Sequence, residues 1–223
     1  AEPVVAASHT AAVVAGMAAF SAGNLDVASA DYADGVVWTV VGDKDTTGKA
    51  AVVEMWKEHR TAFPDTVVKP SWVFDLGDTV AAVTVITGTN TGEMMGKPGS
   101  GKAIAIDAAY LFHFTDGKID RAMEFMDQAN FLTQLGVIPT PEGMPARILP
   151  TLPAETQIVT GAANEANVAI CKSIMEAFKA DTYEAKFREV LAADFTMPDC
   201  MTGGTITGID ATVANLKQAF TMM

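Results

Sequence analysis

The sequence is poor in positive charge. It has 15 Lys and Arg residues against 27 Asp and Glu residues, which gives a net charge of -12. A nucleic-acid-binding domain normally carries a basic patch, and an anionic membrane surface attracts Lys and Arg side chains. The charge balance therefore argues against nucleic-acid and membrane partners.

Side chains that ligate metals are also scarce. The two cysteines, Cys171 and Cys200, form no C-x-x-C pair, and no metal-ligand spacing joins His9, His59 and His113. We therefore expect no metal and no cofactor. One disulfide between the two cysteines is allowed, but two free thiols are the favoured interpretation.

Long apolar runs are missing as well. No run reaches the roughly 20 residues that a membrane-spanning helix needs, and a composition of 49% apolar and 19% charged residues is typical of a soluble globular protein. The sequence begins Ala1-Glu2-Pro3 without Met, as after signal cleavage or after trimming. Together with the acidic composition, this favours an extracytoplasmic location (periplasmic or secreted) over a cytoplasmic one.

The periodicity of the first part of the chain predicts helices followed by an antiparallel meander. This order is typical of an α+β fold in which helices pack on one face of a curved sheet. The predicted helices cover residues 9–22, 25–33 and 49–63, and the predicted strands cover residues 36–41, 67–76, 79–90, 102–114 and 118–127.

The chain then changes character and repeats itself. We predict a first domain at residues 1–138, a Pro-rich linker at residues 139–162 and a partial second copy at residues 163–223, in which Phe178 falls where Phe20 does. The copy contains helices and a first strand but no meander, so its apolar helix face has no sheet to cover. Either the natural chain continues, or this half-domain docks on the first domain or on another subunit.

The segment from the Asp116-Gly117 turn onward carries the most informative pattern. The turn predicts a hairpin, and strict alternation after it places Asp127 in one row with Met123 and Phe125, opposite Glu124. An acid desolvated by apolar neighbours has a raised pKa and can carry protons near neutral pH. The alternative is that Asp127 caps the helix that follows.

Other motifs carry less chemistry. Residues 96–102 match a phosphate-binding loop, but Ala103 replaces the required Ser or Thr and a strand follows, so a hairpin connection is the favoured interpretation. Asp107 shares one strand face with His113, either toward a site or toward solvent. Trp38 and Phe63 belong to an aromatic set that forms either core or the wall of an apolar cavity.

Several short motifs in this order resemble those of one known family. The sequence resembles the SnoaL-like polyketide cyclases of the nuclear-transport-factor-2-like (NTF2-like) superfamily over about residues 10–140. The motifs that carry the resemblance are Phe63-Pro64-Asp65, GTNTGE at residues 88–93, GSGK at residues 99–102, DGKI at residues 116–119, and Asp127 followed by Gln134-Leu135-Gly136.

The resemblance implies a cone-shaped α+β barrel with a deep apolar pocket, often dimeric through its sheet. It also implies that an Asp near the last strand acts as general acid/base in an intramolecular aldol closure without metal or cofactor, and Asp127 matches that position. Relatives commonly carry a His where this sequence has Asn90. Asn can hydrogen-bond a carbonyl but cannot transfer a proton.

Two functions from different classes follow as hypotheses. The first is a cofactor-independent cyclase (including ester cyclases), isomerase or lyase, in which Asp127 moves the proton and Asn90 orients the carbonyl. The second is a non-catalytic ligand-binding or assembly protein on the same fold. Both predict a small apolar ligand and a homo-oligomer. The predicted substrate-binding residues are Trp38, Phe63, Asp107, Met123 and Phe125.

Overall fold

The structure is a computed structural model that describes residues 8–140, 148–161, 164–179, 181–199 and 204–221. Internal contacts divide the chain into two compact units. The first comprises Ala1–Pro141 and Leu149–Gly161, and the second comprises Glu142–Ile148 and Ala162–Met223. No described helix has both the length and the apolar character that crossing a membrane requires.

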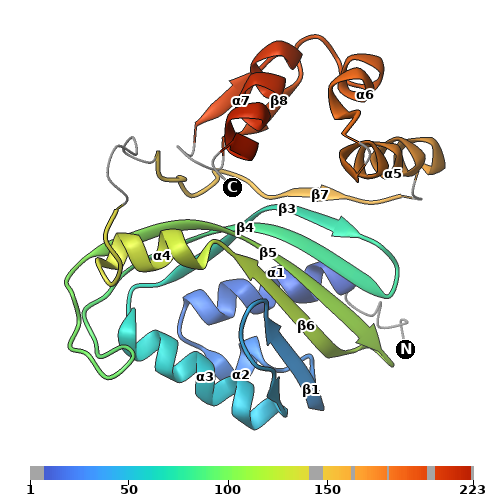
Figure 1. Cartoon of the computed structure of the whole chain (residues 1–223). Helices are drawn as coiled ribbons and strands as arrows, with labels where there is room; N and C mark the ends of the chain where they lie inside the picture. The colour runs from blue at the N-terminus through green and yellow to red at the C-terminus, as the bar shows by residue number, and fades with distance from the viewer. Residues whose placement is uncertain (1–7, 141–147, 162–163, 180, 200–203, 222–223) are drawn as a thin grey trace. The chain divides into compact units, whose positions relative to one another are not determined.

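The first unit is a curved sheet with its N-terminal helices on one face (Figure 1). The strand order is β2-β1-β6-β5-β4-β3-β7; β3 to β6 form an antiparallel meander, while β1 runs parallel to β6. Its elements are α1 (His9–Ser21), α2 (Leu25–Ala28), β1 (Tyr32–Val40), β2 (Thr46–Thr47), α3 (Lys49–Ala62), β3 (Val67–Asp75), β4 (Thr79–Thr89), β5 (Ala103–Thr115), β6 (Lys118–Met126), α4 (Gln128–Leu135) and β7 (Gln157–Val159).

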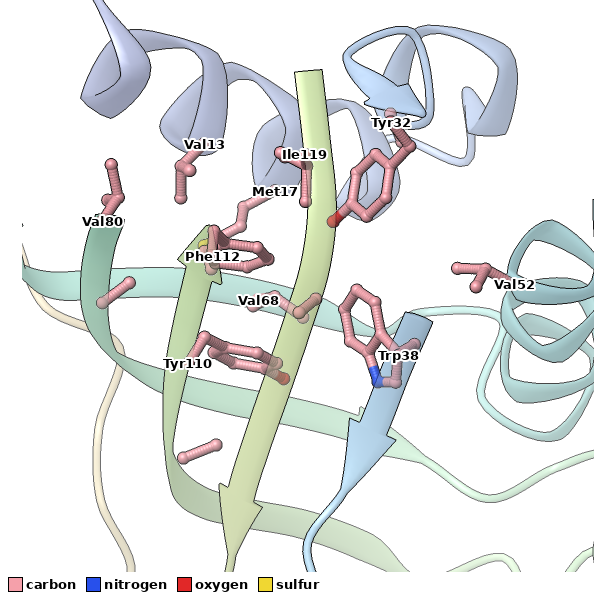
Figure 2. Packing of buried hydrophobic residues seen from close by; sticks show 14 of the residues in the cluster. Val13, Met17, Tyr32, Trp38, Val52, Val68, Val80, Tyr110, Phe112 and Ile119 are labelled. Atoms are coloured by element: carbon pink, nitrogen blue, oxygen red, sulfur yellow. The ribbon is translucent and has the colours of Figure 1, made fainter. Parts of the chain in front are cut away.

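Alternation along the strands builds the core between the sheet and these helices. On β5, Tyr110 and Phe112 are buried on the inner face, while Leu111 between them is exposed. Val13 and Met17 of α1 pack against the same inner face (Figure 2). The predicted α+β architecture is therefore confirmed.

The helix ends follow from local chemistry. Residue Phe63 ends α3 just before Pro64, and Gly136 ends α4 in the left-handed conformation that glycine adopts without strain, with φ 73°. The predicted helix at residues 25–33 is wrong in its second half. Helix α2 ends at Ala28, and the chain already enters β1 at Tyr32.

A β-bulge at Asp120 changes which side chains of β6 face inward. Phe114 pairs with Ile119, but His113 pairs with Arg121, so Asp120 is an extra residue on its strand. The Asp120 carboxylate anchors the bulge: its Oδ1 lies 2.7 Å from His113 Nδ1, and its Oδ2 accepts a 2.9 Å bond from Thr115 Oγ1.

The inner row of β6 beyond the bulge is Ala122, Glu124 and Met126. Ala122 is fully buried, and Glu124 pairs with the inward-facing Tyr110 of β5. The alternation in the sequence predicted that the opposite row, with Met123, Phe125 and Asp127, faces the pocket. This prediction is wrong, because the other row of β6 faces inward. A shift of one residue moves every later side chain to the other face.

Part of the predicted Pro-rich linker belongs to the sheet. Strand β7 pairs in parallel with the edge strand β3. Two side-chain bonds support this pairing: Thr156 Oγ1 donates to Pro70 O at 2.8 Å, and Lys69 Nζ donates to Ala154 O at 3.0 Å. The edge of β3 is thereby paired rather than open.

The second unit is small and mostly helical. Its elements are α5 (Glu165–Lys179), α6 (Tyr183–Val190), β8 (Thr196–Pro198), β9 (Thr205–Thr207) and α7 (Ile209–Thr221). Tyr183, Phe187 and Val213 form its buried core, and the described part of its sheet is the β8–β9 hairpin. Cys171 is a free, exposed thiol, and Cys200 lies outside the described residues.

Candidate functional site

A cavity of about 750 Å³ lies between the helices and the inner face of the sheet in the first unit. This volume falls in the range of roughly 300 to 1,000 Å³ that is typical of small-molecule sites. Its wall is largely aromatic. The aromatic side chains that line it are Phe20, Tyr32, Trp38, Trp56, Phe63, Tyr110, Phe112 and Phe131.

One carboxyl group interrupts this wall in the middle of the sheet. Glu124 lines the cavity, and its Oε1 accepts a 2.9 Å hydrogen bond from Tyr110 Oη. Burial raises the pKa of Glu124, and the hydrogen bond from Tyr110, followed by the nearby indole N–H of Trp38, only partly opposes this effect. The side chain keeps some accessible surface because it borders the cavity. It is therefore an acid whose proton can be exchanged with a bound molecule.

Two tyrosines beside Glu124 hold their protons firmly. Burial, and next the charge of Glu124, raise the pKa of Tyr32 and of Tyr110 well above the ordinary value. Both phenols are therefore hydrogen-bond donors at neutral pH. Figure 2 shows the rings of Tyr32, Tyr110 and Trp38 around the same part of the interior.

The imidazole of His59 is the only histidine side chain in the described lining, and it is neutral. Burial, and next the charge of Arg60, lower the pKa of His59 to about 4. His59 Nε2 lies 3.2 Å from Thr66 Oγ1, and the ring stacks on Phe63. At neutral pH this side chain brings polarity to the cavity without charge.

A family assignment follows from the comparison with known proteins. A model of the SnoaL-like polyketide cyclase family matches residues 11–135. The chain belongs to the SnoaL-like polyketide cyclase family. The predicted family is thus confirmed, and membership supports cyclase- or isomerase-type function in general terms. A search of curated proteins gave no match.

Solved structures show the same fold. AclR, a candidate hydroxylase from Streptomyces galilaeus, is similar with a TM-score of 0.53 and 23% identity over 58% of this chain and 96% of AclR. A candidate polyketide cyclase from Xanthomonas campestris pv. campestris is similar with a TM-score of 0.52 and 21% identity over 56% of this chain and 93% of that chain. At these identities the likeness shows the shared NTF2-like fold alone.

In this SnoaL-like chain the aspartate singled out by the sequence lies outside the cavity wall. Asp127 is exposed and is the N-cap of α4, where its Oδ1 accepts a 2.9 Å bond from Asn130 N. Asp127 therefore caps the helix that follows it, which was the alternative interpretation of the sequence. Met123 and Phe125 precede it on the outer face of the sheet, and Asp107 is exposed on the same face of β5.

Asn90 is buried but holds a loop rather than facing the cavity. Its Nδ2 donates to Ala62 O at 3.2 Å and to Gly92 O at 3.1 Å, and its Oδ1 accepts from Ser100 N at 2.8 Å. These bonds fix the loop whose residues 93–95 line the cavity. Asn90 acts in the structure as a positioning residue for this rim.

Of the predicted substrate-binding residues, Trp38 and Phe63 line the cavity. Sequence reasoning missed Glu124 and Tyr110. The signal that identifies them is their cross-strand pairing on the inner face, which appears only once the extra residue at Asp120 is counted.

Proposed function

We propose that the protein is a cofactor-independent enzyme of the cyclase, isomerase or lyase type that moves a proton on a small, largely apolar carbonyl compound. The observation that carries this proposal is the Glu124 carboxyl group, hydrogen-bonded by Tyr110 inside an aromatic cavity. Such a group has the two properties of a proton carrier near neutral pH: a raised pKa and access to a bound ligand.

The reaction proposed for this site begins at a carbon next to the carbonyl group. The ionised Glu124 carboxylate takes the proton of that carbon, and the electrons of the C–H bond form an enolate. Where a carbon–carbon double bond adjoins that carbon, the enolate is a dienolate and takes the proton back at its far carbon, which shifts the double bond and is isomerisation. Otherwise the enolate attacks a second carbonyl group of the same molecule. In the second case Glu124 returns its proton to the new alkoxide, and a ring is closed.

Asp127 is the rival proton carrier, because the family resemblance implies that role for it. Its capping bond to Asn130 and its exposure favour Glu124 instead. The two assignments are separated by substituting each acid with its amide, because Gln and Asn keep the size and hydrogen-bonding capacity of the side chain but cannot take up a proton.

The test is proton exchange on α-tetralone, a bicyclic ketone with exchangeable protons beside its carbonyl group. The full chain is incubated with this ketone in D₂O, and loss of the α-proton signal is followed by NMR. We expect Glu124→Gln to slow the catalysed exchange by roughly 100-fold or more. Asp127→Asn should leave it within about threefold, because Asn also caps helices well.

The pH dependence gives a second readout. Because the pKa of Glu124 is raised, the exchange rate should keep rising with pH above the range in which an ordinary glutamic acid ionises. Loss of exchange in Asp127→Asn, with exchange retained in Glu124→Gln, would show that Asp127 is the proton carrier and overturn the assignment to Glu124.

Ligand binding without chemistry is the second candidate function. It is favoured because both predicted catalytic residues have structural roles: Asp127 caps α4, and Asn90 holds the loop at the rim of the cavity. Under this alternative the wild-type chain binds α-tetralone but exchanges its protons no faster than buffer does.

A further inference from the structure

The indole N–H of Trp38 is an unpaired donor in the cavity wall. Trp38 is only 6% exposed, and its Nε1 is the one buried side-chain nitrogen or oxygen among the described residues that has no hydrogen-bond partner. Buried polar groups are almost always hydrogen-bonded, and an unsatisfied one costs free energy. Because Trp38 also lines the cavity, a bound molecule could supply the missing acceptor.

The surrounding rings fix the direction of this N–H group. The Trp38 ring lies against the rings of Tyr32, Trp56, Tyr110 and Phe112, whose centroids are 5.6 to 6.2 Å from its own. Figure 2 shows Trp38 on β1 beside Tyr110 across the strand that carries Ile119. A ring packed on so many sides cannot turn to find another partner.

The same N–H group lies beside the proposed proton carrier. The Trp38 N–H group lowers the pKa of the Glu124 carboxyl group. The geometry between the two groups nevertheless does not meet that of a hydrogen bond. An oxygen atom bound at Trp38 Nε1 would therefore lie next to Glu124. For a ketone, the carbon beside the carbonyl group would then be within reach of the carboxylate.

The charge of the cavity lining restricts the ligand further. Asp43, Glu58 and Glu93 are exposed lining residues, and no Lys or Arg occurs among the described residues that line the cavity. A further lining acid, Asp31, is paired with Lys118 at 3.6 Å. The neutral His59 adds no positive charge. Carboxylate and phosphate ligands are repelled by such a lining, whereas an uncharged ketone is not.

We propose that Trp38 Nε1 donates a hydrogen bond to the carbonyl oxygen of an uncharged ligand, and that the acidic lining excludes carboxylate analogues of the same size. This inference rests on the proposed function, because it assigns the carbonyl subsite of the same cavity. When the α-proton moves to Glu124, negative charge develops on the carbonyl oxygen. The indole N–H then stabilises the enolate more strongly than the ketone.

A structural role for the same group makes a different prediction. If a small rotation of Glu124 simply lets it accept the Trp38 N–H, removing the N–H raises the pKa of Glu124 but leaves the bound ketone unchanged. The vibrational frequency of the carbonyl group separates these cases, because a hydrogen bond to the oxygen weakens the C=O bond and lowers its stretching frequency.

The experiment uses α-tetralone labelled with ¹³C at its carbonyl carbon, tetralin as the same skeleton without oxygen, and tetralin carboxylate as the charged analogue. Infrared spectra and affinities are measured with the wild-type chain and with Trp38→Phe. The matched control is Trp72→Phe, which changes a tryptophan that is 46% exposed on β3 and does not line the cavity. Thermal denaturation shows whether each variant is folded.

We expect the carbonyl frequency of the bound ketone to be lower in the wild type and in Trp72→Phe than in Trp38→Phe. The affinity of the ketone should drop by about threefold to tenfold in Trp38→Phe, while the affinity of tetralin stays the same. The carboxylate should bind the wild type at least about tenfold more weakly than the ketone does.

The inference is overturned if wild-type protein binds α-tetralone no better than tetralin, if the bound ketone has the same carbonyl frequency in Trp38→Phe as in the wild type, or if the carboxylate binds as tightly as the ketone. The first and third outcomes are measured on wild-type protein, so the proposal can still be overturned if Trp38→Phe does not fold. If proton exchange is absent but the frequency shift depends on Trp38, the carbonyl subsite stands and the proposed reaction fails.

Discussion

The inner and outer faces of the sheet carry similar side chains but differ in chemistry. On the inner face Glu124 stands among Tyr110, Phe112 and Trp38, and its pKa is raised by burial. The outer face also holds large apolar side chains, yet Phe125 is 38% exposed there and the neighbouring acid caps a helix. The pKa of Glu124 is therefore raised by its enclosure between the sheet and the helices, which form a second layer over the inner face.

The largest expected contrast between the two faces is in packing. Phe112 is 2% exposed on the inner face of β5, and the adjacent Leu111 is 36% exposed on the outer face. Phe112→Ala should lower the free energy of unfolding by about 3 to 5 kcal/mol, and Leu111→Ala by about 1 kcal/mol or less. Urea denaturation followed by tryptophan fluorescence measures both, because all three tryptophans lie in the first unit.

Equal losses in these two variants would remove the contrast. Such a result would mean that the outer face is covered in solution as well as the inner face is, and the comparison would have to be repeated on the assembled form.

Acid sensitivity gives the next contrast, between the half-buried His59 and the exposed His113. The pKa of His59 falls from 6.5 to about 4 in the folded chain, so folding favours its neutral form. The associated stability is present above pH 6.5 and is lost as the pH falls toward 4. Since one pKa unit corresponds to about 1.4 kcal/mol, His59 accounts for a loss of roughly 3 kcal/mol.

Urea denaturation at pH 7 and near pH 4 tests this expectation. His59→Gln should reduce the loss of stability between the two pH values by most of that amount. The same substitution at His113, which bonds Asp120 at the surface, is the matched control and should change the loss much less, because exposed ion pairs contribute little to stability. If the loss of stability between pH 7 and pH 4 is identical in the wild type, His59→Gln and His113→Gln, the lowered pKa of His59 is contradicted.

The smallest expected effect concerns the cap on the outer side. Asp127→Ala removes the acceptor for Asn130 N and should cost about 1 kcal/mol of unfolding free energy. Asp127→Asn keeps a capping oxygen and should stay within about 0.5 kcal/mol of the wild type. If both variants are as stable as the wild type, the side chain is not held as a cap in solution.

The elements of the first unit were largely predictable from the sequence. Helices α1 and α3 have apolar residues at helical spacing, and Pro64 and Gly136 mark helix ends by their backbone restrictions. The turns at Gly77-Asp78 and Asp116-Gly117 separate the strands of the meander. These signals depend only on residues close together in the sequence, so tertiary contacts do not alter what they predict.

The orientation of β6 was not predictable, because it depends on one extra residue. Strict alternation from the Asp116-Gly117 turn extends the inward position of Ile119 to Met123 and Asp127. The bulge at Asp120 interrupts this count and turns Glu124 inward instead. Both rows mix apolar residues with one acid, so composition could not reveal the change.

Contacts between distant segments were also beyond the sequence. The three bonds of the Asn90 side chain join the end of α3 to the loop before β5. The pairing of β7 with β3 joins residues far apart in the chain. Neither contact produces a periodic pattern in the sequence, because the tertiary structure brings the partners together and they are not neighbours along the chain.

The bulge also determines how insertions and deletions would reshape the site during evolution. Loss of Asp120 would make the pairing regular and leave Glu124 facing the cavity, because Arg121 would still pair with His113. Loss of one residue between Asp120 and Glu124 would exchange the rows and direct Phe125 and Asp127 inward. Which acid a relative presents to its ligand thus depends on the number of residues between the bulge and that acid, and not on an aligned aspartate alone.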